Sequence, residues 1–138
     1  MNKIPRDSWA IIERVIRRYP ETKEEYAHTI QELIGGTGRK DGQPGGGGVG
    51  SPTESAAIQL HTPRMERMRR EIEAVEMVYS SLPPEHQKVI RIRFWSDRYR
   101  NMPYRWMRRS VSYEEAQMKR IIGRFIRRVG ERLGEIER

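Results

Sequence analysis

Hydrophobic residues recur along this chain at intervals of three and four positions, which is the period of an α-helix. The first stripe runs from a helix-capping Asp7 to Tyr19, and Pro20 is expected to end that helix. A second stripe follows a capping-box sequence and covers residues 22–34. Residues 1–34 are therefore predicted to form a helical hairpin. The alternative is two helices that become ordered only against a partner, because so short a hairpin buries little surface.

Residues 35–50 form a glycine-rich stretch with nine glycines. A flexible linker is the natural interpretation, because glycine leaves the backbone unrestrained. A phosphate-binding loop is the alternative, and it is not favoured. No strand pattern precedes the stretch, and no Gly-Lys-Ser/Thr sequence ends it.

Residues 51–81 are predicted to form a connecting helix that begins near Ser51-Pro52 and that Pro63 bends or restarts. Its apolar positions alternate by three and four over about two and a half heptads. They are Met65, Met68, Ile72, Val75, Tyr79 and Leu82. This seam is suited to a homodimer through Met65, Met68, Ile72, Val75 and Tyr79. It is equally suited to packing against the N-terminal hairpin or the C-terminal residues of the same chain.

Residues 82–138 are predicted to form a helical C-terminal domain. Pro83-Pro84 opens a helix with an apolar wall, and Pro103 opens a short helix that reaches about Arg109. Ser112 and Glu115 have capping-box spacing, so a longer helix is expected to start there and reach about Ile136. Its arginines are expected on or beside the face opposite an apolar stripe of Met118, Ile121, Ile122, Phe125, Val129, Leu133 and Ile136. Two interior glycines of that helix are interpreted as close-packing or bending points. Since no strand pattern occurs anywhere, the fold class is all-α.

The positive charge lies in this C-terminal domain. Residues 1–81 contain 12 basic and 12 acidic side chains, whereas residues 82–138 contain 15 basic and 7 acidic ones, which accounts for the net charge of +8. Arginine outnumbers lysine there by 13 to 2, which favours forked contacts to phosphates and bases. The distribution indicates a polyanionic partner for this part of the chain. The plainer alternative is that the arginines form solvated helix faces.

A short helix, a tight turn and a longer arginine-bearing helix are the parts of a helix-turn-helix that binds double-stranded DNA. With the second helix starting at Ser112 in the major groove, the side chains placed to reach base edges are Tyr113, Glu114, Gln117 and Arg120. The side chains placed to hold phosphates are Arg105, Arg108, Arg109, Lys119 and Arg124. Aromatic stacking on single-stranded bases is an alternative, although the helical spacing of the tryptophans favours core positions.

The segment Leu82–Phe94 resembles the opening helix of the fourth conserved region of bacterial sigma factors. Over residues 51–134 the chain resembles phage transcriptional regulators of the RinA and ArpU type. That wider resemblance depends on the Ser51-Pro52-Thr53 start, the helix ending at Tyr79 and the final helix from Val111 to Gly134. It implies a sigma-like helix-turn-helix that activates late or packaging genes of a prophage, beside RNA polymerase in the bacterial cytoplasm.

Several kinds of chemistry are not expected. The chain has no cysteine, and its three histidines lie far apart in sequence, so neither a thiol nucleophile nor a metal site is predicted. No catalytic motif and no membrane-spanning run occurs, so we expect no enzyme activity, no cofactor and no membrane partner. Two other functions remain open: a DNA-packaging protein similar to a small terminase subunit, and a helical adaptor that binds an acidic protein.

Overall fold

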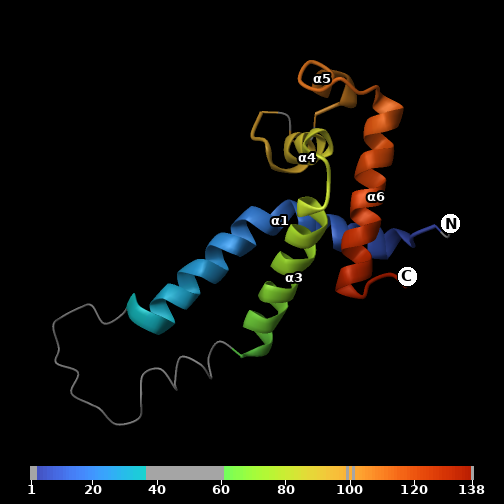
Figure 1. Cartoon of the computed structure of the whole chain (residues 1–138). Coiled ribbons are helices and arrows are strands. Elements are labelled where there is room, and N and C mark those ends of the chain that lie inside the picture. Colours follow the sequence, from blue (N-terminus) through green and yellow to red (C-terminus); the bar gives the residue numbers. More distant parts are fainter. Residues whose placement is uncertain (1–2, 37–60, 99, 101, 138) are drawn as a thin grey trace, which may run out of the picture. The chain divides into compact units, whose positions relative to one another are not determined.

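The computed structural model describes residues 3–36, 61–98, 100 and 102–137, and all regular structure in these residues is helical (Figure 1). The expected all-α class is confirmed. The elements are α1 (Arg6–Gln31), the π-helical turn η1 (Glu32–Gly36), α3 (Pro63–Ser80), α4 (Pro84–Ile90), the π-helical turn η3 (Arg91–Trp95), α5 (Tyr104–Met107) and α6 (Glu115–Leu133).

The chain divides into two compact units, of which the larger comprises Met1–Pro20 with Glu73–Arg138 and the smaller comprises Glu21–Ile72. The predicted linker at residues 35–50 lies almost wholly outside the described residues, apart from Gly35 and Gly36 at the end of η1. The expected helix start at Ser51 also lies outside them.

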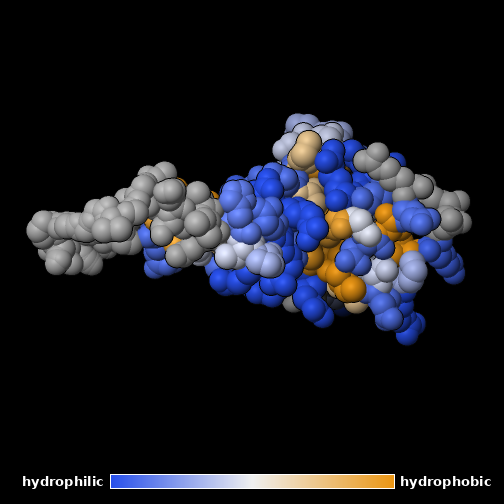
Figure 2. All heavy atoms as spheres, turned by 90° about the horizontal axis from the view of Figure 1, so that it is seen from below, coloured by the Kyte–Doolittle hydropathy of each residue, from blue (hydrophilic) through white to orange (hydrophobic). Residues whose placement is uncertain are grey.

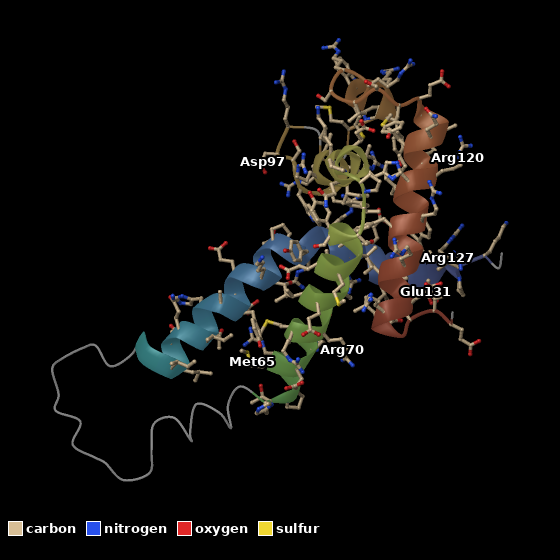
Figure 3. The ribbon with its side chains drawn as sticks, viewed as in Figure 1. Met65, Arg70, Asp97, Arg120, Arg127 and Glu131 are labelled. Atoms are coloured by element: carbon tan, nitrogen blue, oxygen red, sulfur yellow. The ribbon has the colours of Figure 1, made fainter. Side chains whose placement is uncertain are left out.

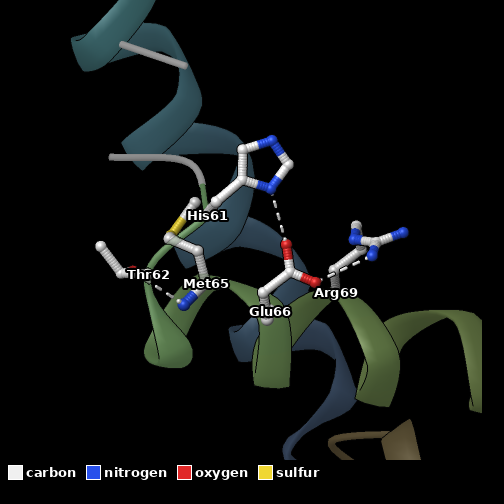
Figure 4. Close-up of polar contacts among 5 residues, drawn as sticks. All are labelled: His61, Thr62, Met65, Glu66 and Arg69. Atoms are coloured by element: carbon white, nitrogen blue, oxygen red, sulfur yellow. Dashed lines mark hydrogen bonds and ion pairs between the residues drawn. The ribbon is translucent and has the colours of Figure 1, made fainter. Parts of the chain in front are cut away.

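In the smaller unit, Pro63 starts a helix, which confirms one of the two expectations for that residue. Thr62 caps α3, because its hydroxyl accepts a hydrogen bond from the Met65 N–H at 3.3 Å. Proline suits the next position since its missing N–H has no partner there. Glu66 accepts hydrogen bonds from Arg69 at 2.9 Å and from His61 at 3.0 Å, and these bonds lower the pKa of its carboxyl (Figure 4).

The proposed dimerisation seam is covered by the chain itself. Met65, Met68 and Ile72 are buried in the smaller unit. Val75 is fully buried in the core of the larger unit, and Tyr79 packs against that core. Packing within one chain, the alternative left open by the heptad pattern, therefore accounts for these side chains. The homodimer stays a prediction.

The prediction that Pro20 ends the first helix is wrong, and so is the hairpin built on it: α1 continues through Pro20 to Gln31. Proline has no N–H to donate to the carbonyl four residues earlier, which belongs to Ile16. In the structure, the indole N–H of Trp95 donates to that carbonyl at 2.7 Å. The Trp95 ring is held between Tyr19 and Tyr79, whose ring centroids lie at 5.1 and 5.4 Å. Trp95, which is distant in sequence, thus supplies the hydrogen bond that the helix lacks at Pro20.

The core of the larger unit combines α1, the end of α3, α4, η3, α5 and α6. The expected apolar stripe of α6 is confirmed, with Met118, Ile122 and Phe125 at most 5% exposed. Ile121 and Val129 of that stripe are also buried, whereas its last two members, Leu133 and Ile136, are half-buried. Ile126, which was not expected in the stripe, is buried as well. The buried residues of α6 join a cluster with Ile12, Ile16, Val75, Val78, Val89, Ile90, Phe94 and Met107. Most of the surface seen in Figure 2 is hydrophilic, with hydrophobic side chains exposed over a limited area.

α6 ends three residues before the expected Ile136, because Gly134 takes a left-handed conformation with φ of 80°. The Glu135 N–H then donates to the Gly130 carbonyl at 2.9 Å, which is the closing bond of a Schellman motif. The turn places Ile136 over Gly130: a Cβ added there would lie 2.7 Å from Ile136 Cδ1 and closer still to Ile12 Cδ1. Gly130 is therefore a close-packing point, as expected for an interior glycine.

Candidate nucleic-acid interface

α5 and α6 form the expected succession of a short helix, a turn and a longer helix. Met107 anchors α5 because its side chain is fully buried. The N–H groups of Ser110 and Val111 both bond to the Met107 carbonyl, at 2.9 and 3.1 Å, and so close the turn that follows. A four-residue helix, a turn and a longer helix thus follow one another, and the core holds them from one side.

The prediction that Ser112 caps the longer helix is wrong, because α6 begins at Glu115 with Glu114 as its cap. The Glu114 N–H donates to Oε1 of Gln117 at 3.1 Å, and the two residues form a capping box. Val111 and Tyr113 pack against the core, which keeps the chain outside the helix through residue 113. Ser112 is exposed in this turn.

The capping role changes what Gln117 can do. A glutamine recognises adenine with its amide oxygen and nitrogen together. Here the Glu114 N–H occupies one of the two acceptor positions of the oxygen, and the amide nitrogen keeps its donors. Both side chains are exposed at the start of α6. The capping box therefore fixes the orientation of the Gln117 amide and restricts the geometry in which it can contact a base.

Tyr113 is half-buried and packs toward the start of α4. Its hydroxyl lies 3.2 Å from a Glu85 oxygen, and its ring meets His86 edge-on at 5.8 Å. Burial raises the pKa of the phenol, and the neighbouring Glu85 carboxylate raises it further. The structure therefore uses Tyr113 in packing, in contrast to the base contact expected of it.

The outer face of α6 carries a row of arginines, hereafter the arginine stripe: Arg120, Arg124, Arg127 and Arg128. Arg120, Arg124 and Arg128 are exposed, and they lie opposite the buried Met118, Ile122 and Phe125. Figure 3 shows Arg120 and Arg127 on the same side of α6. Within the described residues, none of the three exposed arginines has an acidic partner at ion-pair distance. Their charges are thus available to an external anion.

Three further arginines surround α5, and all are exposed. Arg105 and Arg108 form no ion pair with the described residues. The Arg109 guanidinium stacks over the Trp106 ring at 4.5 Å, which orients both side chains at the surface. Arg105 and Arg108 are therefore free to bind an external anion, and the Arg109 guanidinium is held in place beside the turn. Both properties suit the assignment of the three arginines to phosphates.

Lys119 is less available than its assignment to phosphate contact assumed. Its ammonium group pairs with Glu115 at 2.9 Å, and this hydrogen bond raises its pKa. The ammonium group also lies 5.4 Å from the centre of the Tyr104 ring, which in addition carries the Arg93 guanidinium at 4.2 Å. Lys119 stays charged, but part of its charge is already balanced by Glu115.

Sequence reasoning missed a groove on the outer side of α6. It has a volume of about 380 Å³ and is lined by Lys3, Ile4, Trp9, Arg120, Gly123, Arg124 and Arg127. Arg127 and Gly123 share the helix period of the arginine stripe, so the sequence contained a signal for them. Lys3 and Trp9 could not have been found, because nothing near them in sequence indicates that they lie beside α6.

The described part of the chain offers neither a metal-binding cluster nor a membrane-spanning helix. No group of three or more histidine, aspartate or glutamate side chains there is arranged to hold a metal ion. No helix among the same residues combines the length and apolar character needed to cross a membrane. The arginine stripe, the turn after α5 and the adjoining groove are therefore the features on which a function is proposed.

The chain was compared with models of known protein families, with curated proteins and with solved structures. None of the three comparisons found a match.

Proposed function

We propose that this protein is a sequence-specific transcriptional regulator that binds double-stranded DNA through α5, the following turn and α6. The observation that carries the proposal is the arginine stripe. Arg120, Arg124 and Arg128 recur at helical spacing on an exposed face and lack acidic partners among the described residues. A face of this kind is suited to a phosphate-lined groove, where each arginine can replace a condensed counterion.

The contacts at the start of α6 change the assignment of roles. Gln117 is partly engaged by the capping box and Tyr113 by Glu85, so Arg120 is the residue best placed to read a base. Its guanidinium can fork onto the O6 and N7 atoms of a guanine. Arg105, Arg108 and Arg109 are assigned to phosphates, which fix the orientation of the protein without reading sequence.

Salt dependence is the first test of the proposal. If the interface neutralises about five phosphates, a plot of log binding constant against log salt concentration should have a slope near −4.5. Titration of a random-sequence duplex at several salt concentrations, followed by fluorescence anisotropy, gives this slope. Duplex binding that is absent or insensitive to salt would contradict the proposed function.

Two arginine variants separate base reading from phosphate binding. Arg120→Ala should cost about 1–3 kcal/mol on a preferred duplex, selected from a random pool, and little on other duplexes. Arg108→Ala should weaken binding to every duplex alike and reduce the magnitude of the salt slope by about 0.9. Arg18→Ala removes an exposed charge from α1 and is the control. If Arg120→Ala and Arg108→Ala behave alike, Arg120 does not read a base.

The cellular role that we propose rests on two resemblances. Leu82–Phe94 resembles the opening helix of sigma region 4, and residues 51–134 resemble phage regulators of the RinA and ArpU type. On that ground we propose that the regulator acts beside bacterial RNA polymerase on late genes of a prophage. A homodimer through Met65, Met68, Ile72, Val75 and Tyr79 is part of the same hypothesis. It would require these mostly buried side chains to exchange their present contacts for those of a second subunit.

A further inference from the structure

We propose that the groove beside Gly123 binds a phosphate of the DNA backbone, so that the N-terminal residues of the chain form part of the DNA interface. The inference rests on the proposed function and extends it to a segment outside the basic residues 82–138. Lys3 comes from the start of the chain, whereas Arg120, Arg124 and Arg127 come from α6. All belong to the larger unit.

The lining of the groove is suited to an anion. Lys3 and Arg124 are exposed cations of this lining that no other role in the proposed interface claims, and no carboxylate is among the lining residues. These like charges repel one another, and an anion between them would relieve that repulsion. Trp9 and Ile4 pack against the hydrophobic core on the other side, so they provide a wall of fixed position. A groove of about 380 Å³ readily accommodates a phosphate group.

Gly123 keeps the groove open. A Cβ added at this position would meet nothing within 4 Å, in contrast to Gly130 on the same helix. Glycine in a helix interior costs about 1 kcal/mol relative to alanine, and no close packing at Gly123 accounts for that cost. The absence of a side chain leaves the backbone of α6 open to approach by a bound group. We therefore assign Gly123 to ligand access.

The position of the groove along α6 selects a phosphate over a base. Gly123 lies eight residues after Glu115, where α6 begins, which is about 12 Å along the axis. The major groove of DNA is about 8.5 Å deep. If α6 enters with its first turn, residues near Gly123 lie at the rim of the major groove, where the phosphates are. Arg120, one turn nearer the start, lies closer to the bases.

The test uses the full chain and two changes that act on the groove in different ways. Lys3→Ala removes a cation from the lining of the groove. Gly123→Leu adds a large side chain to the lining without changing its charge. Each should weaken binding to a random-sequence duplex about fivefold at roughly 0.15 M salt, the factor that one released counterion supplies. Both variants should also reduce the magnitude of the salt slope by about 0.9, because each removes one phosphate contact. Arg18→Ala, which removes an exposed charge from α1, is the matched control for Lys3→Ala, and Ala27→Leu, which adds the same side chain at an exposed position of α1, is the control for Gly123→Leu. Both controls should remain near wild type.

The outcomes distinguish this inference from the proposed function. If the wild-type chain binds duplexes with the expected salt slope but Lys3→Ala equals Arg18→Ala and Gly123→Leu equals Ala27→Leu, the groove does not contact DNA. If the wild-type chain shows no salt-sensitive binding, the proposed function itself fails.

Inorganic phosphate provides a separate arm of the test, followed by phosphorus NMR in the absence of DNA. We expect no saturable binding at millimolar concentration, because a single phosphate lacks the neighbouring contacts of a duplex. Saturable binding that Lys3→Ala abolishes, together with unchanged duplex affinity in that variant, would assign the groove to a small phosphorylated ligand and overturn the inference.

Discussion

Trp95→Phe is expected to lower the free energy of unfolding by about 2 kcal/mol, although it keeps an aromatic ring between Tyr19 and Tyr79. The reason is the Ile16 carbonyl, which accepts the indole N–H at 2.7 Å and receives no helical bond because Pro20 has no N–H to donate. A buried acceptor without a partner costs about 1–3 kcal/mol. Urea denaturation of the two proteins gives the difference.

A double-mutant cycle of Trp95→Phe and Pro20→Ala tests whether the unpaired Ile16 carbonyl causes the loss of stability. Pro20→Ala restores an N–H four residues after Ile16, so the carbonyl has a partner even when the indole is gone. Trp95→Phe should then cost about 1 kcal/mol less in the Pro20→Ala protein than in the wild type. Trp106→Phe is the matched control, because Trp106 is 37% exposed and should change stability little. Strict additivity of Trp95→Phe and Pro20→Ala would show that the hydrogen bond contributes nothing.

Gly130→Ala is expected to lower the free energy of unfolding by about 1–2 kcal/mol, although alanine is the better helix former. The added Cβ would lie within 2.7 Å of Ile136 Cδ1 and overlap Ile12 Cδ1, which is fully buried. Overpacking of this kind costs about 1–3 kcal/mol, and the helix preference of alanine recovers about 1 kcal/mol of it. Urea denaturation with an unchanged m-value gives the comparison.

Gly123→Ala is the control for Gly130→Ala, because both glycines lie inside α6 and only Gly130 is closely packed. Gly123→Ala should raise stability by up to about 1 kcal/mol. Combining Gly130→Ala with Ile136→Ala should reduce the cost attributed to Gly130, since one of the two overlapping side chains is shortened. If both single alanine variants stabilise the protein, the close packing at Gly130 is not present in solution.

The helical period predicted much of this fold, because it reports which side of each helix is buried. It gave the apolar stripe of α6 and hence the exposed arginines opposite, and the proline at position 63 marked the start of α3. These features are local, so neighbouring residues determine them. The excess of basic residues in positions 82–138 further predicted that the exposed face of α6 is cationic.

The errors arose where contacts distant in sequence outweighed a local signal. Proline generally ends a helix, but here Trp95 donates the hydrogen bond to the Ile16 carbonyl that Pro20 cannot donate. Ser112 is a better helix cap than Glu114 by propensity, yet the packing of Val111 and Tyr113 moves the start of α6 two residues further on. The groove depends on Lys3 lying beside α6, for which the sequence offers no period or motif.

The shared core sets a lower limit on the fragment that can be studied alone. Ile12 and Ile16 of α1 and Val75 of α3 are fully buried in the same cluster as Phe94, Phe125 and Val129. A polypeptide beginning at Leu82 would leave the apolar side of α6 without these three side chains and would expose it to water. Truncation experiments on this protein therefore have to retain the first twenty residues and the end of α3 for the arginine-bearing helix to stay folded.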